Sequence, residues 1–353
     1  MKELVSYIIF IALSGSLFSQ QEYQSSQFMI NPFLINPAYS TSEDYVDLKA
    51  SYRNQWQGVE NAPQTTYISL HTPVGKPRWS RTHPGDFHNW HGTGMIFMKD
   101  DIGPYTFTRV QANYSYNIGL SAGKKYGYYH VDGLRVAIGT FLTYQNNQLN
   151  KKELTQSVSS SGGTVYNPLA GEDETLAGLP ANQSNFNMAF GGLLYYLEKY
   201  YLGVTVTQLF GVEDDFNYTY AKHYYLTGTY KANLGQRSYL IPSVIAKKVF
   251  GTPWSYELNT RYDLDDTYFI GGTYRSQDAM AAMIGYRFNP DRKVLKFRER
   301  VSSFSFEVYY TYDFTINALR KKGLENRSNG SHEITLGILM APKYKERNAE
   351  DTW

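Results

Sequence analysis

The stretch from Val110 to Leu120, VQANYSYNIGL, alternates residue by residue between two kinds of side chain. Apolar or aromatic residues occupy one parity, and amides, a hydroxyl and a glycine occupy the other. Because successive side chains of a β-strand point to opposite faces, this alternation predicts a strand with one apolar and one polar face. The polar face lacks the charged residues typical of a face in bulk water, so the question is what each face touches.

The same alternation recurs along the chain, and no later stretch has a convincing helical period. The predicted strands lie near residues 44–54, 64–74, 93–100, 105–120, 132–146, 185–197, 200–210, 222–233, 238–250, 254–264, 266–276, 279–288, 303–317 and 331–342. Each is close to the roughly 10 residues with which a tilted strand crosses an outer membrane. An even number of strands places both ends of the sheet on the periplasmic side.

Two all-β folds fit this pattern, and the aromatic content separates them. The 353 residues include 33 Tyr, 19 Phe and 5 Trp, and membrane interfaces accommodate rings with one dry and one wet end. A secreted sandwich or repeat protein remains the alternative. We expect a single-domain all-β fold, a transmembrane outer-membrane antiparallel β-barrel of about 14 strands, with a wet interior.

The parity of each strand then assigns side chains to lipid or to the lumen. Residues expected to face lipid are Tyr114, Leu258, Val308, Tyr310 and Leu336. Residues expected to face the lumen are Glu257, Arg261, Asp263, Glu307 and Asp313, with the bulky Phe141 and Tyr309.

The N-terminus predicts export. Lys2 precedes the apolar stretch from Val5 to Leu13, and mostly small residues follow up to Ser19. This order is typical of a signal peptide, although a buried first strand or helix is the alternative. The expected organisation is a signal peptide (1–19), an extended segment (20–43), the barrel (44–342) and a polar tail (343–353).

The extended segment contains two Asn-Pro pairs, Asn31-Pro32 and Asn36-Pro37, within QFMINPFLINPAY. A residue before proline avoids the helical region and asparagine favours turns, so the segment is predicted to be kinked. Two placements stay open from the sequence: inside the periplasmic mouth of the barrel, or against its outside.

Several kinds of chemistry find little support. Cysteine is absent, which excludes disulfides and thiol catalysis, and a net charge of +2 without basic blocks argues against nucleic-acid binding. No nucleophile elbow occurs, so we expect neither an enzyme nor a cofactor. A zinc site at His83, Asp86, His88 and His91 is the weaker interpretation of a turn-rich connection, and calcium at Glu213–Asp215 is unspecific.

Eight stretches, spread over nearly the whole chain, carry a resemblance to a known family. They are QFMINPFLINPAYS, YRNQWQG (Tyr52 to Gly58), APQTTYISLHTPV (Ala62 to Val74), Gly92 to Leu120, Tyr201 to Phe210, Tyr239 to Lys248, Tyr274 to Tyr286 and Gly330 to Ile338. Together they resemble the PorP/SprF family of type IX secretion membrane proteins of Bacteroidetes. The His- and Trp-rich stretch 78–91 and the long polar segment Asn146 to Ser184 look particular to this chain.

The resemblance implies a non-enzymatic barrel in the cell outer membrane, in contact with its lipid and with the type IX machinery. It also implies support for secretion and surface anchoring of a cognate cargo, such as a gliding adhesin, through the cargo's C-terminal domain. A channel or transporter for small solutes or lipids is the alternative. Expected partner-binding residues are Arg53, Asn54, Gln55 and Trp56, although Trp56 and Arg53 could instead belong to the aromatic girdle and the lumen charges.

Overall fold

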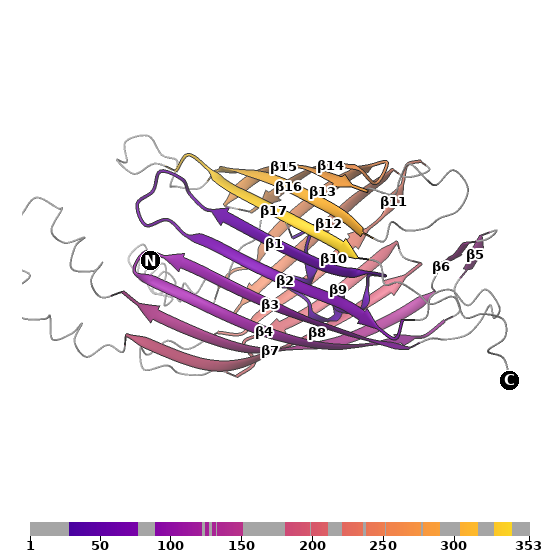
Figure 1. The fold of residues 1–353 in the computed structure, drawn as a ribbon, viewed down its shortest axis with the longest axis horizontal. Coiled ribbons are helices and arrows are strands. Elements are labelled where there is room, and N and C mark those ends of the chain that lie inside the picture. Colours follow the sequence, from indigo (N-terminus) through magenta and orange to yellow (C-terminus); the bar gives the residue numbers. More distant parts are fainter. Residues whose placement is uncertain are drawn as a thin grey trace, which may run out of the picture.

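The computed structural model describes residues 28–76, 89–121, 124–126, 129–131, 133–150, 181–197, 199–210, 221–235, 238–250, 252–276, 278–289, 304–316 and 328–340. Within them the chain forms a closed antiparallel barrel of 14 strands, as the alternation predicts (Figure 1). None of the described helices is long and apolar enough to cross a membrane.

The barrel strands follow one another in the sheet nearly in chain order, and a β10–β12 pairing closes the ring. They are β1 (Val46–Asn54), β2 (Gln64–Val74), β3 (Trp90–Ile102), β4 (Tyr105–Gly119), β7 (Leu134–Leu149), β8 (Asn182–Tyr196), β9 (Tyr200–Thr207), β10 (His223–Tyr230), β12 (Tyr239–Val249), β13 (Ser255–Leu264), β14 (Tyr268–Arg275), β15 (Ala279–Phe288), β16 (Phe304–Thr315) and β17 (Ser331–Met340). The short β11 (Ala232–Asn233) pairs with β12, and β5 (Lys124–Tyr126) and β6 (Tyr129–Val131) form a separate hairpin.

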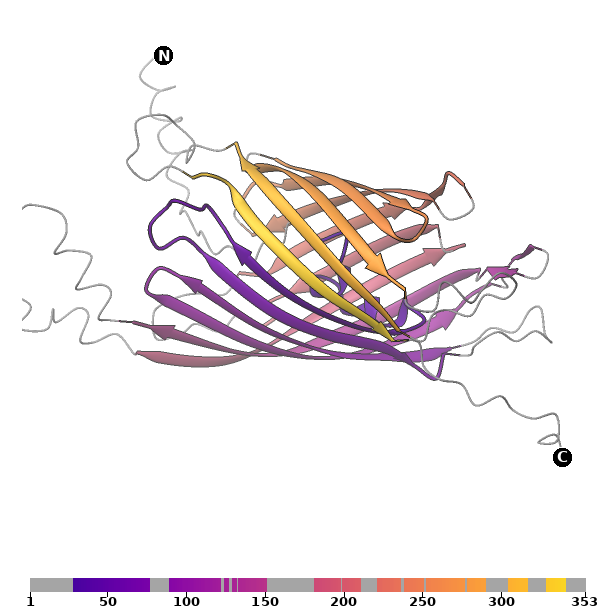
Figure 2. The same ribbon diagram turned by 45° about the horizontal axis from the view of Figure 1, so that its top comes forward.

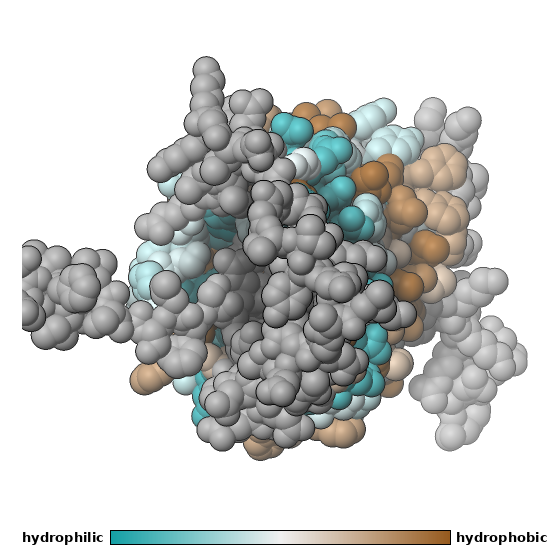
Figure 3. All heavy atoms as spheres, turned by 90° about the vertical axis from the view of Figure 1, so that its left-hand side faces the viewer, coloured by the Kyte–Doolittle hydropathy of each residue, from teal (hydrophilic) through white to brown (hydrophobic). Residues whose placement is uncertain are grey.

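Side chains on the two faces of the wall differ as the strand parity requires. The outward face carries exposed apolar residues, among them Tyr114 (54 %), Leu258 (56 %) and Leu336 (56 %), together with Val308 and Tyr310. Viewed from one end, brown apolar residues gather on the outer side of the wall and teal residues near the rim (Figure 3). This apolar outer surface is the one that a transmembrane barrel presents to lipid.

Strand lengths are uneven around the ring. β4, β7 and β8 run for 15, 16 and 15 residues, whereas β9, β10 and β14 run for 8. The expected loop from Asn146 to Ser184 is therefore too wide at both ends, because β7 continues to Leu149 and β8 begins at Asn182. Residues 151–180 lie outside the described residues.

The ends of the barrel differ in the connections they carry. With an even number of strands, β1 begins and β17 ends at the same end of the barrel (Figure 1). β1 and β7 end, and β2 and β8 begin, at the opposite end, on the left of Figure 1. We call this opposite end the loop end.

The described N-terminal segment lies inside the barrel. It contains two short 3₁₀ helices, η1 (Pro32–Leu34) and η2 (Pro37–Thr41), drawn in indigo within the ring of strands (Figure 2). Helix η2 contacts β2, β3, β4, β7 and β8. Of the two placements that the sequence left open, the structure shows the interior one. We call residues 28–45 the plug.

Candidate functional site

The plug is built from two copies of one short motif, INPFL (30–34) and INPAY (35–39). In each copy asparagine is the N-cap and proline occupies the first helical turn, where its fixed φ fits and its missing N–H costs nothing. The Asn36 side chain accepts a hydrogen bond from the Ala38 nitrogen at 3.0 Å. Each motif therefore forms one tight turn, and two turns in succession fit within a lumen.

Polar side chains attach the plug to the wall along its length. Asn31 donates to the Ser69 hydroxyl at 2.8 Å, and Asn36 donates to the Gly192 carbonyl at 3.0 Å. Three side chains of the wall donate hydrogen bonds to backbone carbonyls of the plug. The pairs are Asn113 to Pro37 (3.0 Å), Trp90 to Thr41 (3.0 Å) and Arg261 to Met29 (2.8 Å). These bonds come from β2, β3, β4, β8 and β13, so the plug is held by several parts of the ring.

Apolar side chains of the plug pack into three separate clusters on the inner wall. Phe33 is fully buried, stacks on the His71 ring at 4.5 Å and meets the Phe141 ring edge-on at 5.2 Å. The second cluster joins Ile30 with Phe269, Met283 and Tyr309, and the third joins Phe28 with Tyr225 and Ile245. Tyr39 lies in the first cluster, and burial raises the pKa of its hydroxyl above the ordinary value.

Glycines on the inner wall allow the plug backbone to approach closely. A methyl group at Gly139 would lie 2.7 Å from the Ala38 nitrogen, and one at Gly191 would lie 2.7 Å from the Pro37 Cδ. Both distances are shorter than van der Waals contact. The wall therefore has a groove, made by missing side chains, that the second INP turn occupies.

The polar face of the stretch from Val110 to Leu120, which belongs mostly to β4, is only partly in contact with water. On β4, Asn113 bonds the plug, Ser115 lies 2.5 Å from the Ser40 hydroxyl, and Asn117 is fully buried. The expectation that this face meets water in the lumen is therefore wrong for the middle of the strand, where the plug covers it. Small amide and hydroxyl groups suit a face that must bond another segment at short range.

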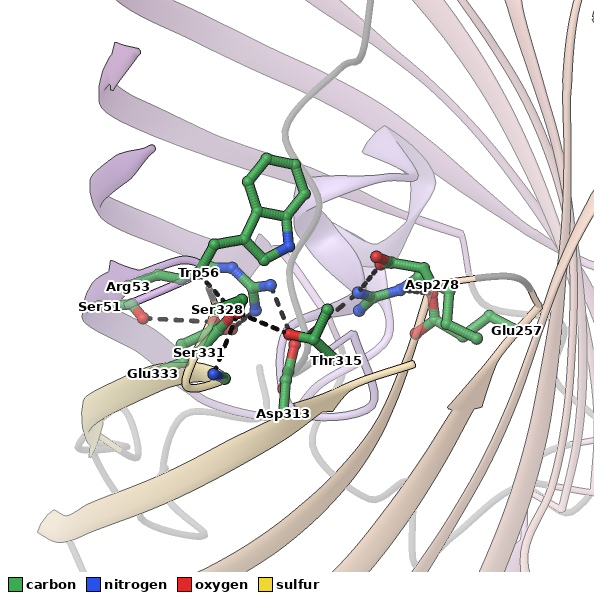
Figure 4. A network of polar contacts seen from close by, with 12 residues as sticks. Ser51, Arg53, Trp56, Glu257, Asp278, Asp313, Thr315, Ser328, Ser331 and Glu333 are labelled. Atoms are coloured by element: carbon green, nitrogen blue, oxygen red, sulfur yellow. Dashed lines mark hydrogen bonds and ion pairs between the residues drawn. The ribbon is translucent and has the colours of Figure 1, made fainter. Parts of the chain in front are cut away.

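A network of buried charges lines the lumen near the loop end (Figure 4). Arg53 on β1 is 1 % exposed and pairs with Asp313 on β16 and Glu333 on β17, both at 3.0 Å. Arg275 on β14 pairs with Asp278 at 2.7 Å and with Glu257 on β13 at 3.4 Å. The pairs join five strands across the inside of the wall.

A second charged group lies nearer the other end of the barrel. Arg261 and Asp263 of β13 pair at 2.7 Å, and Arg287 of β15 pairs with Glu307 of β16 at 2.6 Å. The structure places all five residues that parity assigned to the lumen in these inward ion pairs, which form two groups: Glu257, Arg261, Asp263, Glu307 and Asp313.

The four expected partner-binding residues divide between the lumen and the β1–β2 loop. Arg53 is buried in ion pairs and Gln55 is 8 % exposed, whereas Asn54 and Trp56 are partly exposed. The backbone N–H of Trp56 donates a hydrogen bond to the Ser331 hydroxyl at 3.0 Å. The Trp56 ring extends beyond the ion pairs (Figure 4). Arg53 therefore has its charge satisfied internally, and the partly exposed members of the set are Asn54 and Trp56.

The loop that carries Trp56 is held in a fixed shape. Gln57 and the β16–β17 connection exchange two backbone hydrogen bonds, from Gln57 to Gly330 and from Asn329 to Gln57, both at 2.7 Å. The Gln57 side chain also contacts His332 at 2.9 Å, and Trp56 itself has a positive φ of 50°. An ordered loop with an aromatic residue is a surface that needs little rearrangement to bind a partner.

Of the four possible zinc residues, the structure describes only His91. His83, Asp86 and His88 lie outside the described residues, and His91 points outward, with its Nδ1 2.8 Å from the Tyr114 hydroxyl. Within the described residues no group of three or more His, Cys, Asp or Glu could hold a metal ion. Glu213–Asp215 also lie outside them.

Three features of the site were missed by the sequence reasoning. The plug's contacts with the wall, the inward glycine groove, and the roles of Arg275 and Arg287 as counter-ions all depend on which strands become neighbours. The pentapeptide repeat INPFL–INPAY and the glycines at inward parity were the available signals for the first two.

The comparison with protein families decides the assignment. A family model described as "Type IX secretion system membrane protein PorP/SprF" matches residues 17–338. The chain belongs to the PorP/SprF family. This PorP/SprF protein is thus an outer-membrane β-barrel of a secretion system, as the resemblance implies, and its family associates with the type IX machinery. No curated protein matches the chain in sequence.

Solved structures similar to this PorP/SprF barrel are outer-membrane proteins of low sequence identity. The Ralstonia pickettii toluene transporter TbuX has 8 % identity and a TM-score of 0.47, covering 88 % of this chain and 93 % of its own. The Pseudomonas putida toluene transporter TodX has 8 % and 0.46, covering 89 % and 95 %. Omp33 of Acinetobacter baumannii has 9 % and 0.37, covering 86 % and 100 %. These likenesses are too distant to carry any argument about transport.

Proposed function

We propose that this PorP/SprF protein supports the secretion of one cognate cargo and anchors it at the cell surface through the cargo's C-terminal domain. The observation that carries the proposal is the plug. A segment of the chain itself occupies the lumen, with bonds to five strands and three apolar contacts. A filled lumen suits a scaffold that binds at its surface better than a pore for free diffusion.

We further propose that the loop end faces outward. Barrels of this class keep longer loops outside and short turns in the periplasm, and both ends of their sheet lie on the periplasmic side. Residues 150–181 join β7 to β8, and β7 ends and β8 begins at the loop end, opposite the start of β1. A cargo retained on the surface would then meet the rigid β1–β2 loop, with Trp56 as an aromatic anchor.

Surface retention of the cargo tests this function. Changing Trp56→Ala, and separately shortening residues 151–180, is expected to release cargo into the medium while the barrel still assembles. Trp254→Ala is the matched control, because Trp254 is also an exposed tryptophan (44 %) at the loop end, next to the start of β13. Normal retention in both loop variants, or equal release in the control, would reject docking at this end.

Conductance of the purified protein gives a second measurement. In planar bilayers the plugged barrel is expected to show no large stable currents, because the plug lies between the ends of the lumen. Large currents from the intact protein would favour a channel and contradict the proposal.

A further inference from the structure

The contact between the plug and the wall contains buried polar atoms that bond nothing. Asn31 and Asn113 each donate through the amide nitrogen, at 2.8 and 3.0 Å, but the amide oxygen of each is buried without a hydrogen-bond partner. Asn117 is fully buried, and within the described part of the chain neither its amide oxygen nor its amide nitrogen has a partner. Buried polar groups in proteins are nearly always hydrogen-bonded, so this contact is poorly satisfied.

Asn117 lies next to the end of helix η2. It shares the inward face of β4 with Ser115, whose hydroxyl is 2.5 Å from the Ser40 hydroxyl. Its cross-strand partner on β3 is Trp90, whose indole N–H donates to the Thr41 carbonyl at 3.0 Å. The unbonded amide of Asn117 is therefore beside the two contacts that fix the last turn of the plug.

The unbonded amides disfavour the docked plug. Each of them would bond water if the plug left the wall, and each loses that bond when the plug docks. A wall that held the plug permanently could carry an apolar residue at position 117, as β7 does with Ala137 and Phe141 in the same contact. Close packing combined with such a penalty is what we expect of a segment that docks reversibly, since mobile elements come from the less stable parts of a fold.

The end of the plug next to β1 has a separate attachment. Lys76, which follows β2, donates to the carbonyls of Ser42 and Glu43 at 3.3 and 3.2 Å and pairs with the Asp44 carboxylate. None of these bonds involves the strands that hold η2 by Asn113, Ser115 or Trp90. They can persist when the rest of the plug leaves the wall, so the three residues bonded by Lys76 form a hinge.

We infer that the plug is a reversible gate, in which residues 28–41 undock from the inner wall during export of the cargo and dock again afterwards. This inference rests on the proposed function for the identity of the exported partner. Undocking would hydrate the amides of Asn113 and Asn117 and uncover the groove at Gly139 and Gly191. The docked plug is then the resting state, which keeps the barrel closed when no cargo is present.

A disulfide between the plug and the wall tests the gate in cells. The chain has no cysteine and the Ser40 and Ser115 hydroxyls are 2.5 Å apart, so Ser40→Cys with Ser115→Cys can join η2 to β4. Ser51→Cys with Thr335→Cys is the matched control, because these buried hydroxyls are 2.8 Å apart and join β1 to β17 within the wall. Mass spectrometry of the linked peptides shows that each disulfide has formed.

Oxidation of the cells with copper phenanthroline should stop export in the plug–wall pair, with cargo missing from both the surface and the medium. Reduction of the same cells should restore it, and the wall pair should export cargo in both conditions. Normal export with the plug–wall disulfide formed, or an equal loss in the wall pair, would overturn the inference. Release of cargo into the medium by Trp56→Ala would in that case still support the proposed function.

Hydrogen exchange of the purified protein measures the docking penalty without cargo. Asn117→Leu replaces the unbonded amide with an apolar side chain of similar shape, whereas Asn113→Leu removes the hydrogen bond to the Pro37 carbonyl. Exchange of the plug peptide, followed by mass spectrometry, should slow by about 5- to 150-fold in Asn117→Leu and become faster in Asn113→Leu. Unchanged or faster exchange in Asn117→Leu would refute the penalty, because the amide would then be bonded to ordered water in the docked state.

Discussion

A single methyl group on the inner wall is expected to loosen the plug. In Gly191→Ala the new carbon would lie 2.7 Å from the Pro37 Cδ, inside van der Waals contact, and it would also press on the Asn36 side chain. Gly192→Ala is the matched control, since its methyl group faces outward, 3.4 Å from a Val204 methyl. The two variants differ by one position and one face, and both replace a strand glycine with alanine.

The expected magnitude follows from the cost of overpacking. Inserting a carbon into a packed site costs about 1–3 kcal/mol. If docking of the plug carries this cost, the ratio of docked to undocked plug falls by about 5- to 150-fold. The barrel wall itself should keep its stability, because its ladders do not pass through the plug.

Thiol labelling measures this ratio directly. The chain has no cysteine and Ser40 is fully buried, so Ser40→Cys gives one reporter that reacts only when the plug opens. The rate of reaction with a maleimide should rise about 5- to 150-fold in the Gly191→Ala background and stay unchanged in the Gly192→Ala background. Equal rates in the two backgrounds would refute the claim that the glycine groove holds the plug.

Two further predictions concern the wall. Arg53→Ala removes the 3.0 Å ion pairs of the buried Asp313 and Glu333, which should cost about 3–5 kcal/mol and lower the midpoint of thermal unfolding in detergent. Lys99→Ala, which removes the exposed Lys99–Asp101 pair, should change stability by about 1 kcal/mol or less, and a similar loss in both would contradict the role of burial. A lipid-soluble photolabel should mark Leu258 and Val308 but not Arg261 and Asp313. The reverse pattern would contradict the assignment of side chains to lipid or lumen by strand parity.

The sequence was sufficient to predict the wall because each strand carries its own signal. Alternation is local, so the 14 strands and their outward faces could be found without knowing which strands are neighbours. The two Asn-Pro pairs before β1, Asn31-Pro32 and Asn36-Pro37, likewise predicted the turns in that segment.

The interior was harder to predict because it depends on pairing between distant residues. The sequence INPFL does not indicate that Phe33 stacks on His71. It also does not indicate that Gly139 and Gly191 leave room for the second turn of the plug, INPAY. The counter-ion of Asp313 is Arg53 on β1, 260 residues away in the chain. Such contacts appear only once the ring has closed.

The place of the plug in the chain bears on how the barrel can be assembled. Helix η2 contacts β2, β3, β4, β7 and β8, which follow it in sequence and are five neighbouring strands of the wall. These strands can curve around η2 while the β1–β17 seam is still open, so the plug need not thread into a finished ring. The N-terminal segment would then set the curvature of the strands that contact it. The later strands would complete the cylinder with that curvature.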